Sequence, residues 1–187
     1  INGAGNIAGT IGATNAINTI NVGAAADFTA SGDVSAQTIN YTGAGTLNVN
    51  SGTLTTDSVN FAGHAGMLSL GSGTINGNVS TTTNNTGTLS IKGAATIKGT
   101  IGATNAINNL IIGEGGSLTA TANIGATKVN YTGAGTLDLA TFNLNGAVDF
   151  GGQEGTLSIS GSTATLSTRA TGGVSIGGGK AIVDLVN

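Results

Sequence analysis

The chain has 187 residues, of which 34 are glycine, 7% are charged and 3% are aromatic, and it contains neither proline nor cysteine. The formal net charge is −3 and the five basic residues are scattered, which excludes a phosphate-binding patch and with it a nucleic-acid partner. The lack of cysteine excludes disulfides and thiolate metal sites. No apolar run approaches the roughly 20 residues of a membrane-spanning helix, so we expect no membrane insertion by this segment.

The sequence repeats itself after 90 residues. The phrase GTIGATNAIN stands at 9–18 and again at 99–108, and INYTGAGTLNVN at 39–50 returns as VNYTGAGTLDLA at 129–140. We therefore expect two units, residues 1–90 and 91–187, each of four turns, in one continuous structure that is a fragment of a longer chain.

Short pairs of alternating apolar residues predict strands with one face turned inward. In chain order the pairs are Ile20/Val22, Ile39/Tyr41, Leu47/Val49, Val59/Phe61, Leu68/Leu70, Leu89/Ile91, Leu110/Ile112, Val129/Tyr131, Leu137/Leu139, Val148/Phe150, Leu157/Ile159 and Val174/Ile176. A weaker series of single apolar residues lies between them, at Phe28, Leu54, Ile75, Ile97, Leu118 and Leu144. Glycine, asparagine, threonine and serine separate these elements and favour tight corners.

Four leucines, Leu47, Leu68, Leu89 and Leu110, stand at equal intervals along the chain. One turn cannot bury its apolar face alone, but stacked turns bury a continuous column. The sequence therefore predicts an all-β fold, a right-handed parallel β-helix (β-solenoid) with about 20–21 residues per turn and 8–9 turns. We expect these four leucines to stack in one inward column, and polar residues at equivalent places to form ladders.

Two steps in the spacing are longer than the interval between these leucines. The steps from Ile20 to Leu47 and from Leu110 to Leu137 are equal to each other, and they predict two long turns. We expect the extra residues of these turns, within 29–38 and 119–128, to project from the same side of the rod. Loops on a repeat scaffold often bind partners, although a tolerated surface bulge is the alternative. The candidate partner-binding residues are Ser31, Asp33, Gln37, Asn123 and Lys128.

The single histidine gives no convincing metal or catalytic site. His64 lies in the glycine corner AGHAG, and the second unit has Gln153 in its place. Without cysteine, histidine or paired carboxylates nearby, the sequence predicts an exposed turn residue.

Among the acidic residues, Asp138 and Asp149 could approach each other on one turn, with Glu154 at a corner, as the carboxylates of a glycosidase do. The first unit carries Asn48 and Asn60 at the places of the two aspartates, which fits solvent-facing polar positions better. We therefore expect no enzyme, and no catalytic, cofactor-binding or metal-binding residue.

The stretches GAGNIAGTIGATNAINTINVGAAADFTASG, VNYTGAGTLDL and TTTNNTGTLSIKG resemble passenger regions of bacterial autotransporters, most closely the rickettsial outer membrane protein A and B surface antigens. The resemblance covers nearly the whole chain. It implies a secreted β-helical passenger at the bacterial cell surface, anchored in the outer membrane through a C-terminal region missing from this chain. It further implies adhesion to host cells or a protective surface layer.

Three functions remain open from the sequence. The first is a rigid stalk or host-binding rod, whose partner would be a host-cell surface protein or glycan. The second is a self-assembling surface-layer protein. The third is a β-helical polysaccharide-processing enzyme, which would need exposed acids clustered in a groove.

Overall fold

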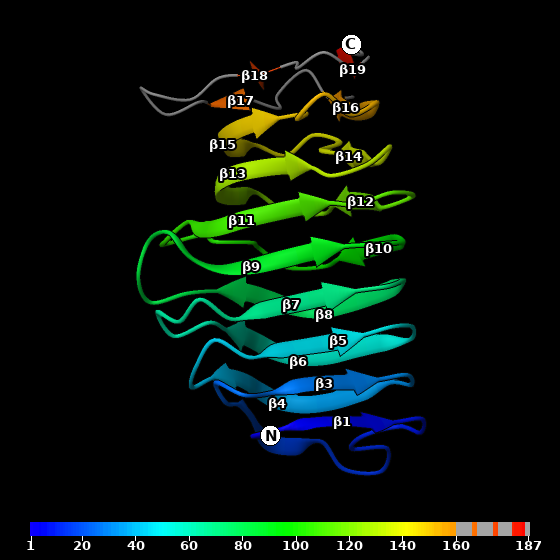
Figure 1. Cartoon of the computed structure of the whole chain (residues 1–187), viewed down its shortest axis with the longest axis vertical. Helices are drawn as coiled ribbons and strands as arrows, with labels where there is room; N and C mark the ends of the chain where they lie inside the picture. The colour runs from blue at the N-terminus through cyan, green and yellow to red at the C-terminus, as the bar shows by residue number, and fades with distance from the viewer. Residues whose placement is uncertain (160–165, 168–173, 176–180, 186–187) are drawn as a thin grey trace.

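A computed structural model describes residues 1–159, 166–167, 174–175 and 181–185. It confirms the predicted fold, because two parallel sheets coil into a β-solenoid of about eight turns, with no helix among the described residues. In Figure 1 the front strands run from left to right while the chain climbs from its N-terminus to its C-terminus, so the coil is right-handed. Ile176, which we expected to share a strand with Val174, lies outside the described residues.

The strands alternate between the two sheets along the chain. The first sheet contains β1 (Ala4–Ile7), β3 (Asp27–Ala30), β5 (Thr46–Val49), β7 (Met67–Leu70), β9 (Thr86–Ile91), β11 (Ile107–Ile112), β13 (Ile124–Tyr131), β15 (Leu144–Asp149) and β17 (Leu166–Ser167), with β18 (Val174–Ser175) also paired to β15. The second contains β2 (Ile17–Val22), β4 (Val34–Tyr41), β6 (Thr53–Asn60), β8 (Gly73–Ser80), β10 (Ala94–Ile97), β12 (Ser117–Ala120), β14 (Thr136–Asp138), β16 (Gly155–Ile159) and β19 (Ala181–Leu185).

The strand registers define three stacks of paired residues around the rod axis. Stack A contains Gly5, Phe28, Leu47, Leu68, Leu89, Leu110, Val129, Val148 and Val174. Stack B contains Ile11, Val34, Leu54, Ile75, Ile97 and Ala120, and continues two residues earlier in the strands through Leu118, Leu137, Leu157 and Val183. Stack C contains Ile20, Ile39, Val59, Val79, Ile101, Ile124, Leu144 and Leu166.

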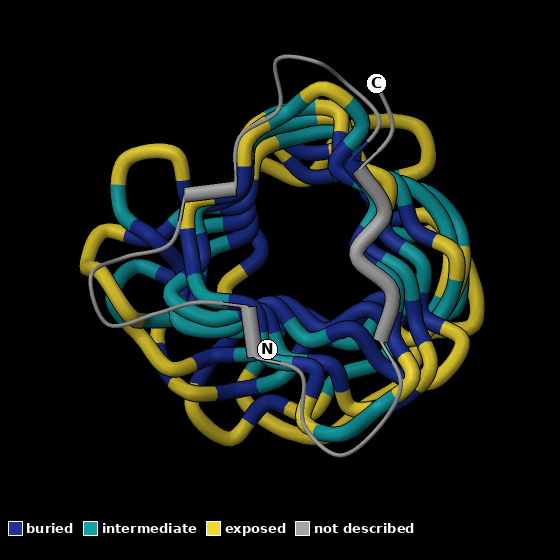
Figure 2. The backbone as a smooth tube through the Cα atoms, turned by 90° about the horizontal axis from the view of Figure 1, so that it is seen from above, coloured by how far each residue is buried: buried dark blue, intermediate teal, exposed yellow. Residues whose placement is uncertain are grey.

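The buried residues line the inside of the coil and the exposed residues lie outside (Figure 2). The column of Leu47, Leu68, Leu89 and Leu110 is confirmed, since these residues pair in sequence order and none is more than 2% exposed. The predicted polar ladders are also present. One consists of Asn21, Asn40 and Asn60, and another of Thr53, Thr74, Thr96 and Thr119.

The prediction of two long turns is wrong. Ile20 belongs to stack C and pairs with Ile39, whereas Leu47 belongs to stack A and pairs with Phe28. The segment between Ile20 and Leu47 therefore passes through four stack positions in place of three. The spacing of the apolar residues could not distinguish a turn with a longer loop from a segment with one additional stack position, because every stack position has the same alternating apolar pattern.

This extra position rotates the second unit against the first. Ile20 lies in stack C, but Leu110, its counterpart 90 residues later, lies in stack A. Val34 lies in stack B, and its counterpart Ile124 lies in stack C. One unit thus makes four full turns and one further stack, about a third of a turn. The expectation that residues 29–38 and 119–128 share one side of the rod is therefore wrong.

Aromatic side chains fill the core beneath two glycine corners. The rings of Tyr41 and Phe61 lie 4.8 Å apart, centroid to centroid, and the Tyr41 hydroxyl donates a hydrogen bond to the Met67 carbonyl at 2.6 Å. Gly66 packs against the Tyr41 ring so closely that a Cβ atom would overlap it. The corner AGHAG therefore ends in glycine for lack of space, since the φ of Gly66 is not among the positive values.

Replacing Gly66 with alanine is expected to lower the free energy of unfolding by about 1–3 kcal/mol, because the added methyl group must displace a buried ring. Urea denaturation followed by circular dichroism measures this loss. Ala65→Ser at the neighbouring exposed position is the control and is expected to change stability by less than about 0.5 kcal/mol. Equal midpoints for the two variants would contradict the steric explanation.

Candidate functional site

The two segments that we expected to project are largely strands. Residues 29–38 fall within β3 and β4, and 119–128 fall within β12 and β13, so that only the short corners 31–33 and 121–123 separate the strands. Neither corner is longer than its neighbours in the coil. The predicted binding loops are therefore ordinary solenoid corners.

Asp33 and Asn123 perform the same structural role in the two units. Asp33 Oδ1 accepts a hydrogen bond from the backbone N–H of Thr53 at 2.7 Å, and Asn123 Oδ1 accepts one from Asn143 at 3.0 Å. Each side chain thus ties its corner to the next turn. Ser31 lies beside Asp33, and its carbonyl accepts a hydrogen bond from the hydroxyl of the next turn's corner serine at 2.9 Å.

Gln37 and Lys128 lie within strands. Gln37 is exposed on β4. Lys128 projects from β13 and forms an ion pair of 2.6 Å with Asp149, with the two side chains 43% and 31% exposed. The hydrogen bond from Lys128, followed by that from the Gly151 N–H, holds the pKa of Asp149 below its usual value. The structure does not gather the five candidate residues into one surface, and partner binding by them stays a prediction.

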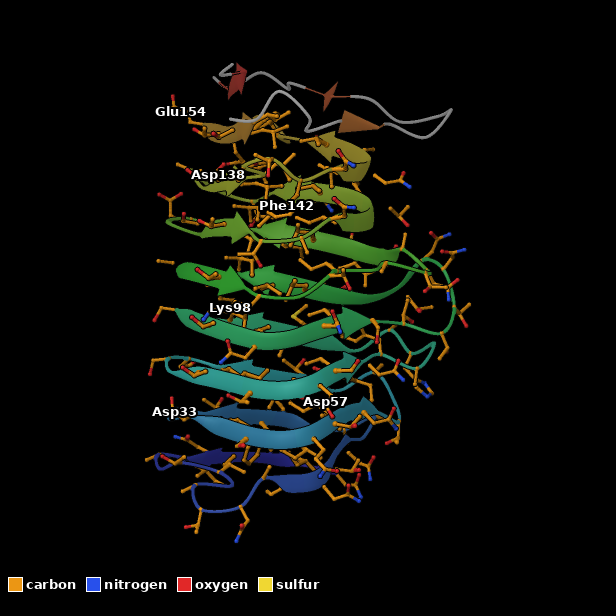
Figure 3. The ribbon with its side chains drawn as sticks, turned by 180° about the vertical axis from the view of Figure 1, so that it is seen from behind. Asp33, Asp57, Lys98, Asp138, Phe142 and Glu154 are labelled. Carbon is orange, nitrogen blue, oxygen red and sulfur yellow. The ribbon has the colours of Figure 1, made fainter. Side chains whose placement is uncertain are left out.

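Asp138 and Asp149 do not form a carboxylate pair. Asp138 lies on β14, whereas Asp149 ends β15 in the other sheet. Asp138 Oδ1 accepts a hydrogen bond from the Ala140 N–H at 2.9 Å, and Asp149 Oδ1 accepts one from the Gly151 N–H at 2.8 Å. Both aspartates therefore cap tight turns. The labelled charged side chains in Figure 3 are spread along the rod.

His64 is exposed in its corner, and its backbone N–H donates a hydrogen bond to the Phe61 carbonyl at 2.8 Å. Over the part of the chain that the structure describes, no group of three or more histidine, cysteine or acidic residues could hold a metal ion. The described residues also contain no helix long and apolar enough to cross a membrane.

The segments that do project are identical in the two units. The sequence GATNA leaves the coil as a bend between stacks B and C at 12–16, and between stacks C and A at 102–106. Gly12 and Gly102 begin these bends with positive φ values of 71° and 59°. In the second unit the Asn105 side chain donates to two carbonyls of the preceding turn, at 3.2 and 3.3 Å. Ala13 and Thr14 are exposed in the first GATNA loop, and Ala103 and Thr104 are exposed in the second.

A shallow polar groove follows the first GATNA loop. It encloses about 240 Å³ between residues 12–16 and the outer surface of the next two turns, which contribute Asp33, Ser35, Thr53 and Thr55. Hydroxyl groups and one carboxylate dominate this lining. Such a surface offers several hydrogen-bond donors and acceptors to a ligand but little apolar area.

An equivalent groove follows the second GATNA loop. It encloses about 210 Å³ and is lined by Asn123, Gly125, Asn143 and Asn145, the counterparts of the four residues of the first groove. Uncharged amides here replace Asp33, Thr53 and Thr55, and a glycine replaces Ser35. The two grooves thus share their geometry but differ in their side chains, and they lie a third of a turn apart around the axis.

These two grooves are the candidate site. One feature of the sequence indicates them. GTIGATNAIN is the longest exact repeat quoted above, and its central five residues carry no large apolar side chain. A segment that is identical in both units and has few apolar residues is expected to form the same corner in each. Whether that corner projects depends on the backbone angles of its first glycine.

No family model, curated protein or solved structure matches this chain.

Proposed function

We propose that this chain is a rigid segment of a secreted bacterial surface passenger of the autotransporter type. It stands outside the outer membrane as a stalk and holds other regions of the passenger at a distance. The observation that carries the proposal is the uninterrupted core between the two units. Leu89 and Leu110 pair across the boundary, and both are fully buried.

Repetition then sets the length of the stalk. Stacked turns are about 4.8 Å apart, so a unit of four and one third turns adds about 21 Å. A solenoid buries its core turn by turn, and each unit therefore extends the rod without a new fold. The proposal gives the chain no catalytic role.

Energy transfer between a membrane dye and a reporter fluorophore tests the stalk. The described chain would be inserted between an outer-membrane anchor and the reporter, with either one unit or two. The second unit is expected to move the reporter away from the membrane by about 21 Å, because the core is continuous.

A glycine- and serine-rich linker of the same length is the control. Such a linker is a flexible coil with an r.m.s. end-to-end distance of about 50 Å for 90 residues and about 75 Å for 180 residues, whereas the rod is expected to extend only about 21 and 42 Å. A reporter distance that does not differ between one and two units, or that matches the flexible linker, would refute the stalk.

The paired grooves favour a second candidate function, a host-binding rod. Two equivalent sites on one rigid scaffold add weak contacts through avidity. Their hydroxyl and amide lining, with one carboxylate in all, suits a neutral glycan better than a charged ligand.

Particles coated with the chain test this second function on glycan-bearing surfaces. Thr55→Lys and Asn145→Lys each place a long charged side chain on the floor of one groove, and both positions are exposed. Because avidity needs both sites, each single variant is expected to lose most of the adhesion, and the double variant is expected to lose the remainder. Ser72→Lys, an exposed position outside both grooves, is the control. Undiminished adhesion of the double variant would remove the grooves as binding sites.

A further inference from the structure

The second GATNA loop borders two hollows on the outer surface of stack C. One is the second groove, which Asn123 and Asn143 line. The other encloses about 240 Å³ and is lined by Ser58, Asn78, Ser80, Thr100, Thr104 and Asn105. Ala103 borders both hollows, so they meet at this loop.

The floors of the two hollows form one line along the rod axis. Backbone N–H groups of stack C donate across successive turns to the carbonyls of Thr100, Asn123 and Asn143, at 2.9, 3.3 and 2.9 Å. On the turns before them, Ser58 and Asn78 pair in register. We call Ser58, Asn78, Thr100, Asn123 and Asn143 the polar track. Stacked turns are about 4.8 Å apart, so the polar track is about 19 Å long.

The polar track and the row of residues beside it are uncharged. The adjacent outward row consists of Asn60, Ser80, Gly102, Gly125 and Asn145. Asp57 and Lys98 stand close in the sequence but line neither hollow. The surface therefore offers hydroxyl and amide groups without a charge that would attract phosphates or carboxylates.

The strands beneath the polar track leave no free edge for a peptide. In the two sheets β6 lies between β4 and β8, and β13 lies between β11 and β15. A peptide that binds by strand addition needs such an edge, and one that binds by its side chains needs apolar area. A neutral ligand rich in hydroxyl groups fits this surface better.

Two asparagines of the polar track have their side-chain oxygens fixed. Asn78 Oδ1 accepts hydrogen bonds from the backbone N–H and the hydroxyl of Thr100, both at 2.9 Å. Asn123 Oδ1 accepts one from the backbone N–H of Asn143 at 3.0 Å. Both asparagines are exposed, and their NH₂ groups can donate to a ligand. Donors that are already ordered cost less entropy on binding than mobile ones.

The second GATNA loop is a fixed wall beside the polar track. Besides the two hydrogen bonds of Asn105, the backbone N–H of Ala106 donates to Asn84 Oδ1 of the preceding turn at 2.8 Å. Ala103 and Thr104 stand exposed at the tip of this anchored loop. A ligand on the polar track is therefore directed along the axis of the rod.

We propose that the polar track binds one extended, neutral polysaccharide chain that lies along the rod axis, with successive sugars on successive turns. This inference rests on the proposed host-binding function and adds the conformation and direction of the ligand. A cellulose-like chain of β-linked pyranoses is extended and advances with each sugar by roughly the spacing of stacked turns, about 4.8 Å. An amylose-like chain of α-linked glucose coils and leaves this line.

Oligosaccharides of increasing length test the axial chain. The probes are cello-oligosaccharides and N-acetylglucosamine oligomers with β-linkages, from dimer to hexamer, titrated while NMR follows the side-chain amides of Asn78 and Asn123. At least one series is expected to gain about fivefold in affinity with each sugar, equivalent to one net hydrogen bond. The gain is expected to end near the pentamer, where the polar track is filled. Malto-oligosaccharides are the control and are expected to show no such gain.

Asn78→Asp and Asn123→Asp test the donors. Each variant keeps the oxygen that the next turn holds and replaces the NH₂ group with a charged acceptor. The fold accepts this exchange, because Asp33, the counterpart of Asn123, makes the same bond to Thr53. Each variant is expected to bind the pentamer about tenfold more weakly. Asn109→Asp, the same substitution on β11 in stack A, is the control and is expected to leave the affinity unchanged.

Ala103→Glu tests whether the two hollows hold one chain. The new side chain stands where the hollows meet, so the affinity for the pentamer is expected to fall to that for the dimer, while the affinity for the dimer stays unchanged. Ala13→Glu has the same local sequence in the first GATNA loop and is the matched control. It is expected to leave the titration of Asn78 and Asn123 unchanged.

Three results would overturn the axial chain. The polar track is not a glycan site if neither β-linked series shifts its amides. An affinity that does not grow with length indicates separate sugar sites. A malto-oligosaccharide series that gains as much with length shows that an extended conformation is not required. The adhesion test of Thr55→Lys and Asn145→Lys decides the host-binding function on its own, so a loss of adhesion beside a failed length series would leave that function in place.

Discussion

Replacing Leu89 with alanine will lower the free energy of unfolding by about 2–5 kcal/mol. Leu89 is fully buried at the middle of stack A, where Leu68 and Leu110 contact it from the turns on either side. Its truncation removes apolar contacts in both directions and leaves a cavity that the regular spacing of the turns prevents from collapsing. Urea denaturation followed by circular dichroism gives the loss directly.

Two controls separate this effect from a general intolerance of substitution. Thr88 is the neighbouring residue with its side chain only half-buried, and Thr88→Ala is expected to cost less than about 0.5 kcal/mol. Ile20 is 8% exposed, against 0% for Leu89, and Ile20→Ala is expected to cost less than Leu89→Ala. A Leu89→Ala loss no larger than that of Thr88→Ala would contradict a stacked core.

The fold was predictable because its determinants are local and periodic. Leu47, Leu68, Leu89 and Leu110 recur at equal intervals, and a column of leucines is the arrangement that buries all four. The first unit has Asn60 where the second has Asp149, and this difference correctly indicated a polar position. Asn60 Oδ1 accepts the Ala62 N–H at 2.8 Å as Asp149 accepts the Gly151 N–H, so both residues cap a turn, and the predicted polar position is correct.

The assignment of residues to stacks A, B and C was not predictable from the same pattern. The segment from Ile20 to Leu47 contains Phe28, Val34 and Ile39, each of which occupies a stack position of its own. An enlarged turn and an additional stack position both place these apolar residues inward. Only the backbone pairing between turns distinguishes them, and pairing joins residues of successive turns without a sequence signal of its own.

The candidate grooves could be predicted only from the repeat together with the stack that each residue occupies. Thr55 and Asn145 face outward beside a GATNA loop only because the intervening turns bring stack B or stack C to that loop. The segments 29–38 and 119–128 were predicted as binding loops because an additional stack position was taken for a longer turn. The segments 12–16 and 102–106 are identical to each other and form exposed corners. An exact repeat that lacks apolar residues is therefore a better guide to a shared corner than a change in spacing.

Alkaline pH will unfold this protein through its two tyrosines. Tyr41 and Tyr131 are 0% and 3% exposed, and their hydroxyls donate to the carbonyls of Met67 and Thr156 at 2.6 and 2.7 Å. Burial raises the pKa of both hydroxyls well above the ordinary value of about 10. The unfolded chain loses these protons near pH 10, while the folded chain retains them.

The direction of the pH dependence follows from that difference. The stability contributed by the protonated tyrosines is fully present below pH 10 and falls as the pH rises from there toward the folded pKa values, since the unfolded state then binds fewer protons. Each tyrosine lowers the free energy of unfolding by about 1.4 kcal/mol per pH unit in this window. Two tyrosines together remove about 2.7 kcal/mol per pH unit, which is enough to exhaust a stability of about 5 kcal/mol, the lower end of the usual range for a domain, by about pH 12.

Tyrosinate absorbance and the β-sheet circular dichroism signal, recorded together between pH 9 and 13, measure this unfolding. Both are expected to change in one coincident transition above pH 10, because the hydroxyls ionise only when the core opens. The variant with Tyr41→Phe and Tyr131→Phe isolates the cause. It loses two hydrogen bonds worth about 1 kcal/mol each at neutral pH, yet its stability is expected to fall less steeply above pH 10. Tyrosinate that forms near pH 10 while the sheet signal stays intact would show that the hydroxyls reach solvent in the folded rod, and the packing of both rings beneath the glycine corners would then be wrong.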